Sequence, residues 1–154
     1  MDDLVLRSVD LPEIEEAGAG GVSRYANDWI GLRHLGAKGR GVVALRDIPA
    51  GTVIERCPVL IIPEKDRPQI DPTIVFTYVY MWEHGTTEQD LYNGTGRAAI
   101  ALGMSSLLNH SFDPTAVFIR RIDELELELR SRKAIAAGEE VTIDYQMKLW
   151  FDPS

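Results

Sequence analysis

Short apolar runs alternate along the chain with glycine- and proline-rich turns, and this pattern predicts a mainly β fold. Several runs of strand length, rich in β-branched residues, lie between residues 41 and 62. Residues 75–82 carry aromatic side chains at every second position, which predicts a further strand with one aromatic face. No long, capped helical pattern occurs in the sequence. The helices that we expect are short and lie at residues 72–76 and 105–108.

Two local patterns make sharper predictions. Residues 116–130 predict a β-hairpin, and residues 125–130 alternate leucine with charged residues, as a half-buried strand does. The pattern basic–x–Ile–x–Ala–Gly occurs twice, at residues 46–51 and 133–138. A glycine at the same offset predicts the same tight, left-handed turn at two strand corners.

The length of 154 residues is that of one domain. We expect residues 23–154 to form this domain and to end in a short C-terminal tail. Residues 1–22 form a predicted N-terminal arm, and the glycine-rich residues 18–21 form a flexible joint. The arm itself is either disordered or docked as an edge strand.

The cysteine and hydropathy patterns point to a reducing compartment. Cys57 is the only cysteine, so no intramolecular disulfide can form, and with three histidines a cysteine-rich zinc site is not expected. No apolar run approaches the ~20 residues of a membrane span. The first residues are acidic and lack the apolar core of a secretory signal. We therefore expect a cytoplasmic protein without a metal site.

The net charge of −8 indicates which kinds of partner the protein can bind. Residues 1–30 hold seven acidic and two basic residues, which is more than half of this imbalance. An acidic protein repels phosphate backbones, so direct nucleic-acid binding is not expected, whereas basic proteins or peptides are attracted. In the alternative interpretation, the charge only keeps the protein soluble. A homodimer is compatible with the composition.

Three segments carry candidate chemistry. Residues 38–41 (Lys-Gly-Arg-Gly) precede a strand, and taken alone they form an ordinary tight turn. Residues 107–114 contain Asn-His-Ser. Without a functional role, this segment is a capped turn with a core histidine. Residues 138–145 read as a strand that ends in Asp-Tyr, or as an amphipathic edge strand. A Ser-His-Asp hydrolase is a poor interpretation, because Ser111 and His110 are sequence neighbours without a nucleophile elbow.

Taken together and in this order, the three segments resemble the SET domain of protein lysine methyltransferases. Residues 39–44 resemble the cofactor-side Gly-x-Gly segment, residues 109–114 the Asn-His-Ser motif with its proline, and residues 138–145 the closing Gly-Glu-Glu-Val-Thr-x-x-Tyr motif. The resemblance implies the SET (β-clip) fold of small curved sheets with short helices. It also implies that the closing strand is threaded beside the Asn-His-Ser loop in a pseudoknot-like arrangement.

The resemblance further implies S-adenosylmethionine as cofactor and a protein lysine as methyl acceptor, which enter from opposite faces and meet at Tyr145, the catalytic tyrosine. The implied cofactor-binding residues are Lys38, Gly39, Arg40, Gly41, Asn109, His110 and Trp150. Trp150 covers the adenine or the channel mouth in this interpretation, and packs on the core in the alternative one. The implied lysine channel includes Phe118, Ile143 and Tyr80.

The channel residues predict the number of methyl groups. In this family, aromatic hydroxyls hold a channel water that limits further methylation. Phe118 and Ile143 have no hydroxyl, so the sequence predicts a product beyond monomethyl-lysine, unless Tyr78 or Tyr80 supplies one.

The sequence also departs from the family. Thr115 stands where an asparagine often follows the proline, and a hydroxyl replaces only part of the bonding of an amide. Cysteine-rich flanks are absent from this sequence, so the compact form resembles bacterial or viral members. Two other classes of function stay open: a SET-fold interaction module without catalysis, and, ranked last, the β-clip of sugar-acid and antifreeze-type domains, to which residues 40–55 are similar.

Overall fold

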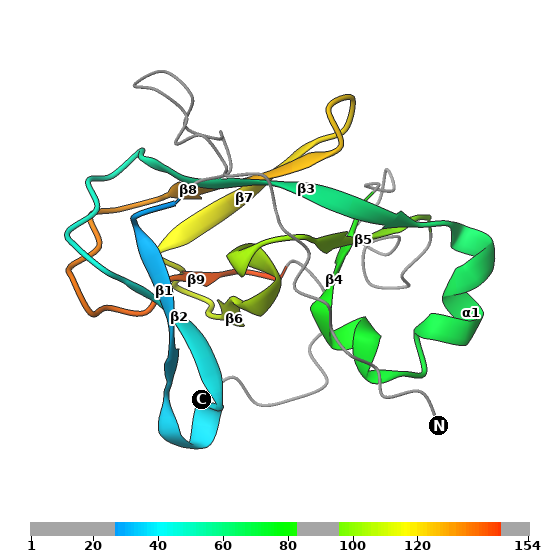
Figure 1. Ribbon diagram of the computed structural model, residues 1–154, viewed down its shortest axis with the longest axis horizontal. Coiled ribbons are helices and arrows are strands. Elements are labelled where there is room, and N and C mark those ends of the chain that lie inside the picture. Colours follow the sequence, from blue (N-terminus) through cyan, green and yellow to red (C-terminus); the bar gives the residue numbers. More distant parts are fainter. Residues whose placement is uncertain (1–26, 83–95, 146–154) are drawn as a thin grey trace, which may run out of the picture.

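The computed structural model describes residues 27–82 and 96–145, which form short strands joined by tight turns (Figure 1). The strands are β1 (Ile30–His34), β2 (Arg40–Ala44), β3 (Val53–Ile62), β4 (Val79–Met81), β5 (Ala98–Ala101), β6 (Asn109–His110), β7 (Ala116–Arg121), β8 (Glu126–Ser131) and β9 (Thr142–Ile143). The helical elements are α1 (Arg67–Ile70) and the 3-10 turns Gly36–Lys38, Glu64–Asp66, Ile74–Tyr78 and Met104–Leu107. The predicted arm and Trp150 lie outside the described residues.

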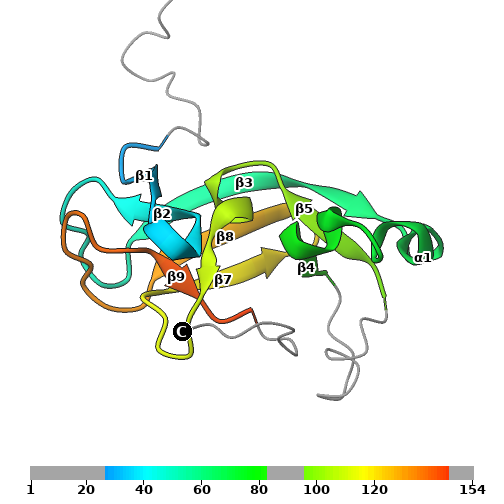
Figure 2. The same cartoon turned by 90° about the horizontal axis from the view of Figure 1, so that it is seen from below.

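The strands form three small sheets. The largest has five antiparallel strands in the order β4-β5-β3-β8-β7, β1 pairs with β2, and β6 pairs with β9. Figure 2 shows the five-stranded sheet across the molecule, with the β1–β2 hairpin at one end and α1 at the other. The mainly β fold with short helices is therefore confirmed. In the described part of the chain, no helix is long and apolar enough to cross a membrane.

The predicted hairpin is present, but its charged side is not exposed to water. β7 pairs with β8 in the expected region, and the leucines of β8 are buried as predicted. Glu128 is also buried, with 0% relative exposure, because Arg56, Arg121 and Arg130 each approach its carboxylate to 2.9 Å. Burial alone raises the pKa of Glu128, but the hydrogen bonds from Arg121 and Arg56 outweigh it and hold the pKa below its usual range. An alternating pattern therefore predicted the strand correctly and the exposure of its charged face wrongly.

The two copies of the repeated pattern form matching turns, as predicted. Gly51 and Gly138 both have left-handed backbones, with φ of 78° and 84°. The two copies also face each other, because Ile48 and Ile135 pair in an antiparallel bridge and both are 1% exposed. The repeat thus brings two distant strand corners together around the core.

The aromatic segment differs from its prediction. Residues 74–78 form a 3-10 turn, and only Val79–Met81 forms a strand. The Thr73 hydroxyl accepts a hydrogen bond from the Val75 N–H at 3.2 Å, and this cap begins the turn. Short helices were expected at residues 72–76 and 105–108. The 3-10 turns Ile74–Tyr78 and Met104–Leu107 confirm them with shifted bounds.

The closing segment is threaded between two other segments of the chain. β9 pairs with β6 in parallel, so that Asn109 lies opposite Thr142 and His110 opposite Ile143. Just before β9, the Val141 N–H donates to the carbonyl of Val42 in β2 at 2.8 Å. The predicted pseudoknot-like arrangement is therefore present, with β2 on one side of the closing segment and β6 on the other.

Thr115 contributes to this arrangement in place of the asparagine. Its hydroxyl donates to the Glu140 carbonyl at 3.2 Å and accepts from the Thr142 N–H at 3.0 Å. The Thr115 N–H in turn donates to the Thr142 hydroxyl at 3.2 Å. A single hydroxyl thus both donates to and accepts from the closing segment.

Candidate active site

Two neighbouring pockets share one wall. We call the first the tyrosine pocket, and its lining is Phe76, Thr77, Tyr78, Val79, Tyr80, Ser105, Ser106, Leu108 and Tyr145. We call the second the basic pocket, and its lining is Lys38, Arg40, Thr77, Tyr78, Ser106, Leu107, Leu108, Asn109 and Tyr145. The two linings share Thr77, Tyr78, Ser106, Leu108 and Tyr145, so the two pockets meet at the end of the closing segment.

Asn109, at the start of β6, is held firmly in the basic pocket. Its amide nitrogen donates to the Arg40 carbonyl at 3.1 Å and to the Glu140 carboxylate at 2.7 Å. Both N–H donors of the amide are thereby used, and its oxygen is left as the group that can accept from a ligand. Lys38 lies 3.5 Å from the other oxygen of Glu140, so one carboxylate links the amide to a cation of the same pocket.

Gly41 lets these groups come together. A Cβ placed on it would approach the Glu140 carboxylate to 2.8 Å and the Asn109 amide nitrogen to 3.0 Å. No side chain fits at this distance, so glycine is required for the contact between β2 and the two later motifs. Gly39, two residues earlier, has a φ of 75°, and its missing side chain faces open space.

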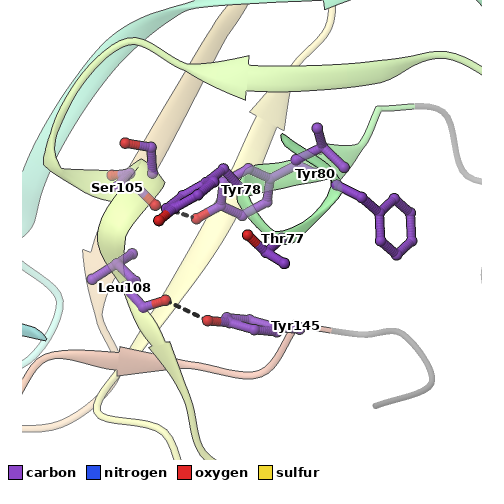
Figure 3. A pocket seen from close by; sticks show the side chains of 9 residues that line it. Thr77, Tyr78, Tyr80, Ser105, Leu108 and Tyr145 are labelled. Carbon is purple, nitrogen blue, oxygen red and sulfur yellow. Dashed lines mark hydrogen bonds between the residues drawn. The ribbon is translucent and has the colours of Figure 1, made fainter. Parts of the chain in front are cut away.

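Tyr145 lies two residues after β9 and lines both pockets. Figure 3 shows it among the residues of the tyrosine pocket. Its hydroxyl donates to the Leu108 carbonyl at 2.6 Å, and its N–H donates to Nδ1 of His110 at 2.9 Å. Burial raises the pKa of Tyr145 to about 12, and the charges of Glu140 and Tyr78 add to the shift. The phenol therefore stays protonated at neutral pH.

His110 lines neither pocket but contacts Tyr145 directly. The residue is 6% exposed, and its ring packs edge-on against the ring of Tyr145, with centroids 5.1 Å apart. Because Nδ1 accepts a hydrogen bond, the imidazole is neutral and carries its proton on Nε2. Burial lowers the pKa of His110, and the Asp144 carboxylate, 3.8 Å from Nδ1, opposes this only partly.

We predict that stability depends on pH through His110. Its pKa in the folded chain lies below its ordinary value of 6.5, so the unfolded chain binds more protons. The contribution of His110 to stability is therefore fully present above pH 6.5 and is lost as pH decreases through the folded-state pKa. Urea unfolding between about pH 5 and pH 7.5 measures this dependence. The variant His110→Asn keeps an acceptor for the Tyr145 N–H and should flatten the curve; an unchanged slope would assign it to other groups.

The sequence-predicted residues are only partly brought together. Lys38, Arg40, Asn109 and Tyr145 line the basic pocket, whereas Gly39, Gly41 and His110 are adjacent to its lining. Tyr80 lines the tyrosine pocket. Phe118 is 7% exposed and packs edge-on against the ring of Tyr80, at 4.8 Å between centroids. Ile143 is 1% exposed within the core, so neither of these two side chains lies in the pocket linings.

Several residues of the site were not identified from the sequence. The carbonyls of Ser105 and Leu108 are the acceptors for Tyr80 and Tyr145, and no side-chain motif signals a backbone acceptor. Glu140 lay within the closing motif but had no assigned partner. In the structure, Glu140 lies beside the Gly-x-Gly segment, because the next residue, Val141, is hydrogen-bonded to β2.

The family model described as "SET domain" matches residues 39–146. A histone-lysine N-methyltransferase of Schizosaccharomyces pombe, described as H3 lysine-37 specific, is 31% identical over 122 residues, which are 79% of this chain and 76% of that protein. The chain therefore belongs to the SET domain family, and it is a protein-lysine methyltransferase of that family.

Solved structures show the same fold. A Plasmodium falciparum protein assigned as a histone methyltransferase has a TM-score of 0.58 and 22% identity, over 82% of this chain and all of that one. The Neurospora SET domain protein DIM-5, a histone lysine methyltransferase, has the same TM-score and identity over 82% of this chain and 55% of its own. The likeness to bacterial or viral members stays a prediction.

Proposed function

We propose that the two pockets serve the two reactants of a methyl transfer. S-adenosylmethionine binds in the basic pocket, and the side chain of a protein lysine enters the tyrosine pocket. The observation that carries this assignment is that the two linings meet at Tyr145 and Leu108, where a methyl group can pass between them. Methyl transfer depends above all on alignment of the reacting atoms, and two preformed pockets that share one wall provide it.

The residues of the basic pocket fit the cofactor. The Asn109 oxygen is a fixed acceptor suited to an ammonium group, and Lys38 and Arg40 supply positive charge suited to a carboxylate. S-adenosylmethionine carries both groups, and when bound it supplies an electrophilic methyl group on a sulfonium. Glu140 keeps the Asn109 amide in the orientation that this contact needs.

The tyrosine pocket suits the acceptor lysine. The lining contains no charged side chain, so the pocket disfavours an ammonium and favours the neutral amine that is able to attack. Tyr80 and Tyr145 already donate their hydroxyl hydrogens to backbone carbonyls. Their oxygens can therefore only accept, and they favour the amine and the methyl group through N–H···O and weak C–H···O contacts.

A basic segment of a protein is the expected substrate. The net charge of −8 favours association with basic chains. The Schizosaccharomyces pombe relative is described as specific for lysine 37 of histone H3, which makes histone H3 the first substrate to test.

The test incubates the purified chain with histone H3, a set of lysine-containing peptides and isotope-labelled S-adenosylmethionine. Mass spectrometry should find labelled methyl groups on lysine, and isothermal titration calorimetry should show cofactor binding. Binding of a protein without cofactor binding or transfer would instead support the non-catalytic module. A labelled residue other than lysine would contradict the proposal.

The lining of the tyrosine pocket also affects how many methyl groups the lysine is expected to receive. The expected product beyond monomethyl-lysine depended on Phe118 and Ile143, whereas the tyrosine hydroxyls in the lining belong to Tyr78, Tyr80 and Tyr145. Those of Tyr80 and Tyr145 already donate to backbone carbonyls. We expect Tyr78→Phe to raise the proportion of di- and trimethyl product, because it removes a hydroxyl that can hold a channel water. Mass spectrometry over a long time course measures the distribution. The matched variant Phe118→Tyr alters a residue outside the lining and should change it less; equal effects would mean that the lining does not set product number.

A further inference from the structure

A buried carboxyl group lies behind the site and has no role in the mechanism described so far. Glu55 on β3 is 7% exposed and lies on the sheet face opposite Glu128, because β3 places Arg56 opposite Glu128 and successive side chains alternate. Its Oε1 accepts hydrogen bonds from the Ser105 N–H at 2.8 Å and the Ser105 hydroxyl at 2.6 Å. Its Oε2 accepts from the Met104 N–H at 3.2 Å.

These three bonds fix the 3-10 turn Met104–Leu107. This turn and Leu108, which follows it directly, carry the backbone acceptors of the tyrosine pocket. The Ser105 carbonyl accepts from the Tyr80 hydroxyl at 2.7 Å, and the Leu108 carbonyl, three residues later, accepts from the Tyr145 hydroxyl at 2.6 Å (Figure 3). Both tyrosine oxygens are therefore located by one short segment. The position of that segment depends on Glu55.

The packing around Glu55 leaves this arrangement little freedom. A Cβ on Gly103 would approach the Glu55 carboxyl to 3.0 Å and the Cys57 Cβ to 2.9 Å. The backbone of Gly103 is extended, so the glycine serves to leave room for the carboxyl and not to allow an unusual φ. A satisfied buried polar network of this kind makes a segment rigid, whereas an apolar side chain would leave the Ser105 N–H unpaired.

We propose that Glu55 is a positioning residue for methyl transfer. It holds the Met104–Leu107 turn so that the Ser105 and Leu108 carbonyls place the hydroxyl oxygens of Tyr80 and Tyr145 around the lysine amine. This inference rests on the proposed function of the tyrosine pocket. It assigns to Glu55 an effect on the transfer step and not on binding of the cofactor, whose contacts lie at Asn109 and Lys38.

The main test compares Glu55→Leu with Glu55→Gln. The leucine removes all three acceptors, and we expect kcat to fall about 10- to 100-fold while KM and cofactor affinity change less than about threefold. The glutamine keeps an oxygen for both Ser105 bonds, so kcat should recover to within about threefold of the unsubstituted chain. Glu128→Leu is the matched control, because it removes a buried carboxylate from the other face of the same sheet.

A second readout does not depend on activity. The chain is labelled with 3-fluorotyrosine, and the fluorine resonances are assigned with single Tyr→Phe variants. We expect Glu55→Leu to shift the Tyr80 and Tyr145 resonances and Glu128→Leu to leave them in place. If Glu55→Leu does not fold, Gly103→Ala replaces it, since its Cβ displaces the Glu55 carboxyl.

Three results would overturn the inference: full kcat in a folded Glu55→Leu, unchanged tyrosine resonances, or an equal loss of kcat in Glu128→Leu. If the unsubstituted chain methylates no lysine while the resonances still shift, the proposed function fails and the coupling of Glu55 to the two tyrosines stands. The two failures are thus distinguishable.

Discussion

Tyr145→Phe is expected to keep the fold and to lower kcat about 10²- to 10³-fold, the usual effect of deleting one positioned polar group in an active site. The hydroxyl lies where the two pockets meet and is fixed by the Leu108 carbonyl at 2.6 Å. It acts through its oxygen and its position and not as a base, because its pKa of about 12 keeps it protonated. The ring, which packs on His110, is retained in phenylalanine, so stability should change little.

The measurement is single-turnover methylation followed by mass spectrometry, together with cofactor affinity by calorimetry. Cofactor affinity should stay within about threefold, because the contacts assigned to the cofactor are on other residues. Near-full turnover in a folded Tyr145→Phe would remove Tyr145 from the catalytic role.

The second large effect is expected for Asn109→Ala, which should weaken cofactor binding and destabilise the chain. The change deletes the amide oxygen assigned to the cofactor, and it leaves the Arg40 carbonyl and the Glu140 carboxylate without their shared donor. Unsatisfied groups of this kind cost about 1–3 kcal/mol each when buried, and the partial exposure of this site reduces the figure. We expect cofactor affinity to fall about 10- to 100-fold.

Calorimetry and urea unfolding separate the two effects. Glu140→Gln is the matched control, because its amide oxygen still accepts from Asn109 while the exposed contact with Lys38 is lost, a loss of little consequence. An unchanged cofactor affinity in Asn109→Ala would place the cofactor elsewhere, whatever the loss of stability.

The sequence determined the elements whose signals are local. The alternating leucines predicted the β7–β8 hairpin, because side chains of a strand alternate between its faces. The repeated Ala-Gly predicted two left-handed turns, because glycine alone adopts a positive φ without strain. The order of the three motifs predicted the threading of β9 beside β6, through the family resemblance and not through any local rule.

Only the tertiary structure decided which faces are covered and which groups meet. A period of two shows which residues share a face, but the burial of Glu128 depends on arginines from three strands, Arg56, Arg121 and Arg130. The aromatic period suggested a strand where the Thr73 cap begins a 3-10 turn, because a local hydrogen bond outweighed the strand propensity. The tyrosine pocket depends on the carbonyls of Ser105 and Leu108. Every residue has a carbonyl, so the sequence carries no sign of which ones accept a hydrogen bond from a tyrosine.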